Sequence, residues 1–161
     1  MKPFAELTEF GQVRRLRRLA EEVLQAYSLE VKRVRLLAYD TNFLYRIDCA
    51  AGKKYVLRIY TDDNSSLAET RTEVFWLNAL RRDTDLQVVR VVPRADGAFI
   101  NITDMPGLPA ARRSVLFDWV PGRSLDDQLR SEYYHQLGSI TARLHQHARA
   151  LSLPADIQPK R

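Results

Sequence analysis

Three segments rich in β-branched and aromatic residues follow one another early in the chain, with only short links between them. The segments are residues 33–38, 43–48 and 55–60, and the links are residues 40–42 and 50–54. Their composition is typical of strands. Links this short allow only antiparallel pairing, because parallel neighbours need a crossover of about a dozen residues or more. The sequence therefore predicts an antiparallel meander.

Helical periodicity appears on both sides of this meander. Residues 8–28 repeat apolar side chains at three- and four-residue spacing, and Thr8 is placed as an N-cap. The repeating positions are Phe10, Val13, Leu16, Ala20, Val23, Leu24 and Tyr27. Downstream, Ser66 and Glu69 have the spacing of a capping box, which predicts a helix through about Arg82.

Further strand segments follow the second helix. Residues 88–92 and 98–102 are joined by a Pro-Arg-Ala-Asp-Gly turn, and residues 114–120 form a last strand that Pro121-Gly122 ends abruptly. Strands and helices in this order predict an α+β fold. We expect a five-stranded antiparallel sheet with a helix inserted after the third strand.

Two helices are expected after the Pro-Gly break. Ser124 and Asp127 predict a short helix to about Arg130, and a longer helix spans roughly residues 131–151. One face of the longer helix is apolar and consists of Tyr133, Leu137, Ile140, Leu144, Ala148 and Leu151.

The chain is basic, with 25 Lys+Arg against 20 Asp+Glu and a net charge of +5. Its densest basic clusters, residues 14–18 and 32–35, are interleaved with glutamates, as on a solvated helix face. Nucleic-acid binders usually show a one-sided basic stripe. We expect no nucleic-acid partner. The alternative of a basic nucleic-acid-binding protein would use Arg14, Arg15, Arg17, Arg18, Lys32, Arg33 and Arg35.

Several other classes of protein and site are disfavoured. The single cysteine, Cys49, cannot form an internal disulfide or a thiolate metal cluster. No apolar run approaches the ~20 residues of a membrane span, and the N-terminus lacks the apolar core of a signal peptide. The three histidines lack the spacing of zinc ligands on a helix. We expect a cytoplasmic protein with no membrane segment and no metal ligands of its own.

Several short sequence fragments are weakly specific alone but become informative through their order and spacing along the chain. They are Asn42-Phe-Leu-Tyr45, Tyr55-Val-Leu-Arg58, Glu73-Val-Phe-Trp-Leu-Asn-Ala-Leu80, Asp96-Gly97, residues 116–122, Leu137-Gly138 and Leu144-His145. Together they resemble the N-terminal lobe of the aminoglycoside phosphotransferase family, which shares the protein-kinase-like fold with homoserine and choline kinases. The resemblance covers about residues 31–150. After the leading amphipathic helix in residues 1–30, it implies a kinase-like nucleotide-binding lobe in residues 31–120 and a hinge with the first helices of an incomplete C-lobe in residues 121–161.

The resemblance implies a phosphate-binding role for Arg58. Kinase-like lobes neutralise the triphosphate with a cation on the third strand, and an arginine there can fork two phosphate oxygens. Glu73 would hold this cation, while the competing Glu69 is already explained by the capping box. In the alternative, Arg58 is a surface residue at a strand edge and Glu73 pairs along its own helix with Arg71 or Arg81.

The first hairpin turn, residues 39–43, takes the place of the phosphate-covering loop of the family, with Asn42 near a family asparagine. The turn contains no glycine, so the close backbone approach of a glycine-rich loop is not available. A simple turn role for Asp40 and Asn42 stays open.

The segment 117–122 resembles the hinge between lobes. By this resemblance, the backbone carbonyl of Asp118 and the backbone amide of Val120 would bond the adenine edge, and Phe117 would sit behind the base. A buried edge strand followed by a turn is the alternative.

The catalytic residues of the family are expected beyond this segment. Family members continue into a His-x-Asp loop with a downstream Asn and then a metal-binding Asp, which together accept the substrate proton and hold Mg²⁺. After Asp127 this sequence contains only Asp156, with no suitable Asn behind it. We expect a chain truncated before the catalytic loop and inactive alone, with the metal ligands in the missing lobe.

The resemblance therefore implies the nucleotide-binding lobe of a phosphotransferase that uses ATP or GTP with Mg²⁺ and acts on a hydroxyl of a small molecule. A non-catalytic kinase-like binding module remains the alternative. In either case the apolar face of residues 131–151 lacks its usual partner lobe and predicts self-association. The sequence does not identify the acceptor.

Overall fold

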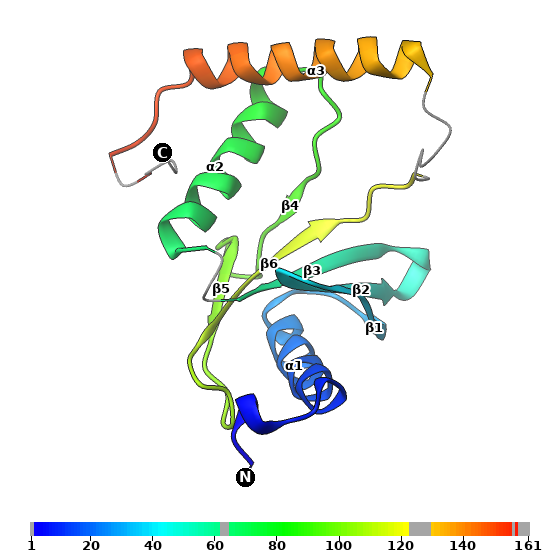
Figure 1. Ribbon diagram of the computed structural model, residues 1–161, viewed down its shortest axis with the longest axis vertical. Helices are drawn as coiled ribbons and strands as arrows, with labels where there is room; N and C mark the ends of the chain where they lie inside the picture. Colours follow the sequence, from blue (N-terminus) through cyan, green and yellow to red (C-terminus); the bar gives the residue numbers. More distant parts are fainter. Residues whose placement is uncertain (1, 62–64, 123–129, 156, 158–161) are drawn as a thin grey trace.

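The computed structural model describes residues 2–61, 65–122, 130–155 and 157. Its helices and strands follow the expected order along the chain (Figure 1). They are α1 (Glu9–Val23), β1 (Val31–Tyr39), β2 (Asn42–Cys49), β3 (Lys54–Tyr60), α2 (Leu67–Asp83), β4 (Val91–Val92), β5 (Ile100–Thr103), β6 (Arg112–Asp118) and α3 (Ser131–Ala150). Short 3-10 helices lie at Phe4–Glu6, Leu24–Ala26 and Ala50–Gly52.

The sheet is antiparallel throughout, in the order β1-β2-β3-β6-β4, with β5 also paired to β6. The meander predicted from the short links is confirmed as β1, β2 and β3. The α+β fold with a helix inserted after the third strand is confirmed as well.

The expected count of five strands is wrong by one: each of the six strand segments named from the sequence contributes a strand to the sheet. Both β4 and β5 pair with the edge of β6 that β3 leaves open, β4 opposite Leu116 and Phe117 and β5 opposite residues 112–115. They therefore share one position in the sheet. The turn between them, in which the amide of Arg94 donates to the carbonyl of Ala98 at 2.8 Å, separates them into two strands.

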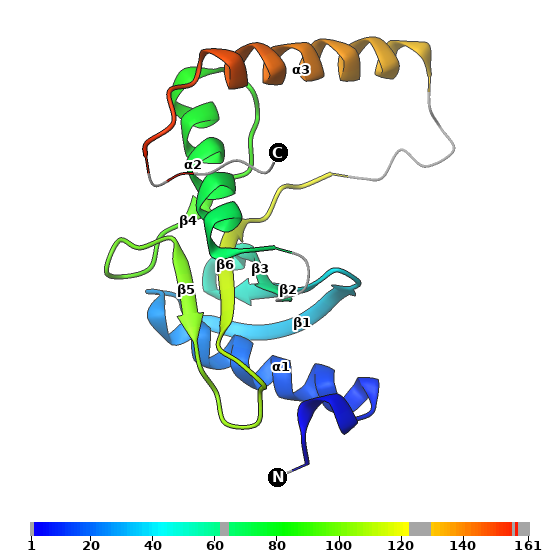
Figure 2. The same cartoon turned by 60° about the vertical axis from the view of Figure 1, so that its left-hand side comes forward.

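Side chains alternate between the two faces of the sheet, and each face packs on a different helix (Figures 1 and 2). The face toward α1 forms the larger core, which includes Leu16, Leu19, Val23, Phe43, Tyr45, Ile47, Leu57, Ile59 and Leu116. The face toward α2 forms a smaller core of Tyr60, Val74, Val91, Val115 and Phe117. Arg58, the predicted phosphate-binding residue, lies on the face of the sheet toward α2, because it belongs to the same alternating set of side chains as Tyr60 and Phe117.

Both helix starts predicted from capping residues are confirmed. The Thr8 hydroxyl accepts from the amide of Gly11 at 3.3 Å. At α2 the amide of Glu69 donates to the Ser66 hydroxyl at 3.2 Å, and the Glu69 carboxylate accepts from the amide of Ser66 at 2.6 Å. This reciprocal box fixes where α2 begins and therefore which side chains it turns toward the sheet.

Three local expectations need correction or fall outside the description. Phe10, counted with the apolar face of the first helix, is 89% exposed, and Phe4 of the preceding turn packs on the core instead. The last strand ends at Asp118, two residues earlier than expected. The short helix predicted near Ser124 lies outside the described residues.

The helix α3 lies across the C-terminal end of α2 (Figure 2), and none of its residues is buried. Its main polar tie is His147. The indole N–H of Trp76 donates to Nδ1 of His147 at 3.2 Å, and Nε2 lies 3.1 Å from Oδ2 of Asp83. Because Nδ1 accepts a hydrogen bond, Nε2 carries the proton and donates to Asp83. Arg143 adds an exposed ion pair with Asp85.

In the described part of the chain, no helix combines the length and the apolar character that a membrane span requires.

Candidate nucleotide-binding site

The predicted pairing of the strand arginine with the helix glutamate is present in the structure. Nη1 of Arg58 lies 2.6 Å from Oε1 of Glu73, with about a third of each side chain exposed. The pairing follows from how α2 begins. The Glu69 carboxylate is bound in the capping box with Ser66, and Glu73 lies one turn further along α2, above β3. The alternative, in which Glu73 pairs along its own helix, does not match this geometry.

Tyr60 is a member of this cluster that the sequence reasoning missed. Its hydroxyl donates to Oε2 of Glu73 at 2.8 Å and lies 3.4 Å from Nη1 of Arg58. Burial, reinforced by the charge of Glu73, raises the pKa of Tyr60, so its hydroxyl stays protonated. The strand alternation contained the signal, since Arg58 and Tyr60 are two residues apart on β3 and share one face.

The electrostatic balance keeps Arg58 charged. Burial acts to lower its pKa, but the electrostatic contributions of Tyr60 and Glu73 and their hydrogen bonds outweigh this, and the net effect raises the pKa. The guanidinium also lies over the ring of Phe117, 4.9 Å from the ring centroid. This arrangement adds a cation–π attraction.

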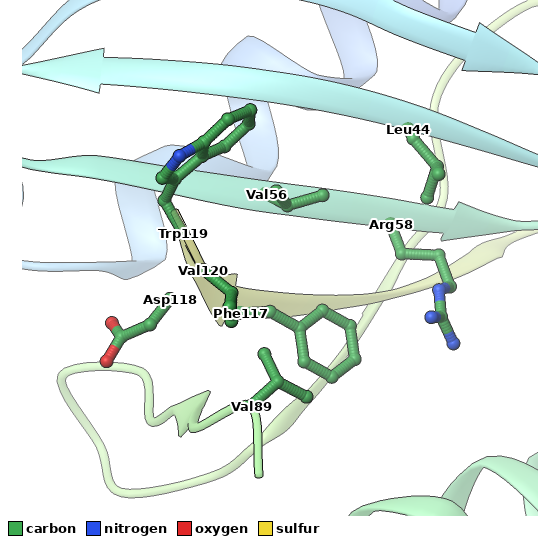
Figure 3. A pocket seen from close by; sticks show the side chains of 8 residues that line it. All are labelled: Leu44, Val56, Arg58, Val89, Phe117, Asp118, Trp119 and Val120. Atoms are coloured by element: carbon green, nitrogen blue, oxygen red, sulfur yellow. The ribbon is translucent and has the colours of Figure 1, made fainter. Parts of the chain in front are cut away.

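A pocket of about 240 Å³ opens beside this arginine, between β2, β3 and the end of β6. Figure 3 shows Arg58 and the Phe117 ring together in the pocket wall, with Asp118 and Trp119 farther along it. Its lining residues are Leu44, Val56, Arg58, Val89, Phe117, Asp118, Trp119 and Val120. Four of the six residues predicted for the site therefore meet here: Arg58, Phe117, Asp118 and Val120.

The end of β6 is held from both sides. The amide of Asp118 donates to the carbonyl of Arg90 at 2.9 Å, and the amide of Trp119 donates to the carbonyl of Lys54 at 3.2 Å. The Asp118 carboxylate forms a two-point ion pair with Arg90, at 2.6 and 3.0 Å. Val120 is 61% exposed, and within residues 2–61, 65–122 and 130–155 no backbone group accepts from its amide.

The other two predicted residues lie outside the pocket lining. Glu73 acts on it only through Arg58. Asn42 begins β2 opposite Tyr60, and its Oδ1 is buried with no hydrogen-bond partner in the described part of the chain. Asn42 is on the same strand as the pocket residue Leu44 but does not line the pocket, so its role in nucleotide binding stays a prediction.

A second cluster at the hinge end of the pocket was also missed. The guanidinium of Arg46 lies 5.1 Å from the ring centroid of Trp119 and is bound to the carboxylate of Asp48, which Arg35 also binds at 2.7 Å. Burial acts to raise the pKa of Asp48, but hydrogen bonds from Arg46 and Arg35 outweigh it and lower the pKa. Three strand residues thereby support the Trp119 wall.

No group of three or more His, Cys, Asp or Glu side chains suited to a metal ion occurs among the residues that the structure describes. The lining of the pocket is mostly apolar, and its charged residues are Arg58 and Asp118. The pocket offers a flat apolar slot with a fixed arginine at one end, which suits an aromatic ligand carrying negative charge.

Comparisons with known proteins agree with this geometry. The structure of the microcompartment-associated aminopropanol kinase is 30% identical, with a TM-score of 0.74 over 89% of this chain and 44% of that one. The structure of the amicoumacin kinase hAmiN in complex with AMP-PNP, Ca²⁺ and Ami is 20% identical, with a TM-score of 0.74 over 85% of this chain and 41% of that one. The chain thus spans less than half the length of either kinase. No curated protein matches the sequence.

The decisive comparison is with family models. Residues 33–161, most of the chain, match the model of the phosphotransferase enzyme family. The resemblance found in the strand and hinge fragments is therefore confirmed, and the chain belongs to the phosphotransferase enzyme family.

Proposed function

We propose that this chain is the nucleotide-binding lobe of a phosphotransferase that moves the γ-phosphoryl group of ATP or GTP to a hydroxyl of a small molecule. One observation carries the proposal: Arg58, held by its ion pair with Glu73, lines an apolar pocket whose wall also contains the predicted hinge residues. Phosphoryl transfer needs a fixed positive charge beside the triphosphate, and Arg58 supplies it.

The residues present fit a nucleotide. Leu44, Val56 and Phe117 provide apolar surface for a purine, and the backbone carbonyl of Asp118 and the backbone amide of Val120 would hydrogen-bond its edge. When bound, the nucleotide supplies the phosphoryl group, and the chain orients it. The chain spans less than half the length of the two similar kinases, and we propose that the Mg²⁺ ligands lie in the remaining lobe of a longer protein.

The test of binding is calorimetric titration of the 161-residue chain with Mg·ATP and, separately, Mg·GTP. Arg58→Ala is expected to weaken binding by roughly tenfold or more, because a charge-assisted contact to phosphate is worth about 1.5–3 kcal/mol. Arg71→Ala, on the exposed side of α2, is the matched control. Equal affinity of wild type and Arg58→Ala would return Arg58 to a structural role.

We further propose that the chain alone does not transfer phosphate, since a His-x-Asp loop with its downstream Asn does not occur in the sequence. Incubation of the purified chain with Mg·ATP and a panel of amino alcohols and aminoglycosides should give no phosphorylated product, and any turnover would refute this.

The intact mass of the protein from its native source distinguishes the kinase from a non-catalytic binding module. A mass above 18.6 kDa supports the kinase, and 18.6 kDa supports a non-catalytic binding module.

The exposed face of α3 supports the proposal that the chain self-associates. Leu137 and Ile140 of its apolar stripe are 61% and 45% exposed. Light scattering at ~100 µM, where weak interfaces fill, is expected to show species above monomer mass. A sharp monomer peak would contradict this.

A cytoplasmic location also remains part of the proposal, and it rests on the single buried cysteine.

A further inference from the structure

Both carboxylate oxygens of Glu73 are occupied, each by a different partner. Oε1 receives Nη1 of Arg58 at 2.6 Å, and Oε2 receives the hydroxyl of Tyr60 at 2.8 Å. An arginine and a carboxylate left to themselves can form a two-point pair that uses both oxygens. Here the second oxygen is taken, so Glu73 meets Arg58 through one oxygen only.

This one-point pairing leaves most of the guanidinium unused. A guanidinium carries five N–H donors, and in the described part of the chain every hydrogen bond of Arg58 runs from Nη1. The remaining donors belong to a side chain that lines the pocket next to Phe117, with the guanidinium 4.9 Å from the ring centroid (Figure 3). They are therefore placed to bind an anionic ligand that enters the pocket.

The Tyr60 hydroxyl is itself well fixed. Tyr60 is only 3% exposed, and the guanidinium of Arg113, a residue of β6, lies 5.7 Å from the centroid of the Tyr60 ring. Arg113 in turn donates to the Thr70 hydroxyl at 3.2 Å and to the carbonyl of Ser65 at the start of α2. The phenol is thus anchored independently of Arg58, which lets it set the orientation of Glu73.

We propose that Tyr60 is a positioning residue of the nucleotide site: it occupies the second oxygen of Glu73 and so reserves the free edge of Arg58 for the phosphates of the nucleotide. The inference rests on the proposed function and deepens it. Without the phenol, Glu73 rotates both oxygens onto Arg58, and the donors meant for phosphate are consumed within the protein.

The test is Tyr60→Phe, which keeps the ring, its packing and its contact with Arg113 and removes only the hydroxyl. Affinity for Mg·ATP should fall about threefold to tenfold, the worth of one hydrogen bond. Affinity for adenosine, which has no phosphate, should not change. In a Glu73→Ala background the same substitution should add nothing to the loss, because its effect passes through Glu73.

Tyr45→Phe is the matched control. It removes another buried tyrosine hydroxyl, one that donates to the carbonyl of Val13 at 3.2 Å on the opposite face of the sheet. It should leave both affinities unchanged.

The possible results separate the inference from the function beneath it. If Arg58→Ala weakens Mg·ATP binding and Tyr60→Phe does not, the positioning role is refuted while the nucleotide site stands. If Tyr60→Phe weakens ATP and adenosine equally, the residue only shapes the pocket, and the inference again fails. If Arg58→Ala binds Mg·ATP as wild type does, the proposed function fails and the inference with it.

Discussion

Replacing His147 by alanine is expected to release α3 from α2 while the sheet stays folded. The imidazole is only 9% exposed and links Trp76 to Asp83. Its removal leaves the half-buried indole N–H of Trp76 without its acceptor, and loss of such a hydrogen bond costs about 0.5–1.5 kcal/mol. Asp83 adds little to this cost, because Arg82 still binds both of its oxygens and the carboxylate faces solvent.

A cost of this size shifts the docking equilibrium of α3 by roughly two- to twelvefold toward the released form. Little else holds the helix, since none of its residues is buried and the pair between Arg143 and Asp85 is exposed. A released helix loses the packing from which most helical stability in proteins comes, so its amides become open to exchange.

Hydrogen-exchange mass spectrometry measures this release directly. Amides of α3 should exchange faster in His147→Ala by the factor given above, while amides of β2 and β3 keep their wild-type protection. His145→Ala, two residues away on an exposed position of the same helix, is the control and should behave as wild type. Identical exchange of α3 in wild type and His147→Ala would show that the histidine does not secure the helix.

Two further predictions concern acid and the core. Hydrogen bonds from Arg82 and His147 lower the pKa of Asp83 to about 2, so its stabilising effect is complete above the pKa of about 3.9 in an unfolded chain and is lost as the pH falls toward 2. Asp83→Asn should flatten that part of the acid dependence of urea unfolding, and an unchanged slope would contradict it. Leu57→Ala, at a fully buried position on central β3, should lower the free energy of unfolding by about 2–5 kcal/mol, against a change within about 0.5 kcal/mol for Arg71→Ala on the surface.

The parts of the site that sequence reasoning found depend on local rules. The Ser66 box fixed the phase of α2, and strand alternation fixed the face of β3, so the meeting of Arg58 and Glu73 followed from two short-range patterns. Of the parts that it missed, Tyr60 follows from the alternation along β3, whereas the contact of Arg46 with Trp119 depends on strand register. Arg46 on β2 reaches Trp119, which directly follows β6, across the intervening strand β3, and no short-range pattern specifies which residues come opposite each other.

The shortened β4 has a physical cause of the same kind. Residues 88–92 have strand composition, but β6 ends at Asp118, opposite residue 90. Residues 88 and 89 therefore lie past the end of β6, the strand with which β4 pairs. Strand propensity describes a residue's fit to a sheet, whereas the length of a strand depends on its partner. Val89 instead contributes its side chain to the pocket.

Register also explains how the core and the site depend on each other. The β3–β6 pairing places Arg58 opposite Val115 and Val56 opposite Phe117, which puts the arginine on the same face as Glu73 and the pocket. A slip of one residue would turn Arg58 into the core beside α1 and bring Leu57 or Ile59 to the pocket. Those two residues are completely buried against α1, so burial of apolar surface on one face holds the charge in place on the other. The large core on the α1 side is therefore what fixes the cation of the candidate site, and loss of that packing should weaken nucleotide binding before it unfolds the chain.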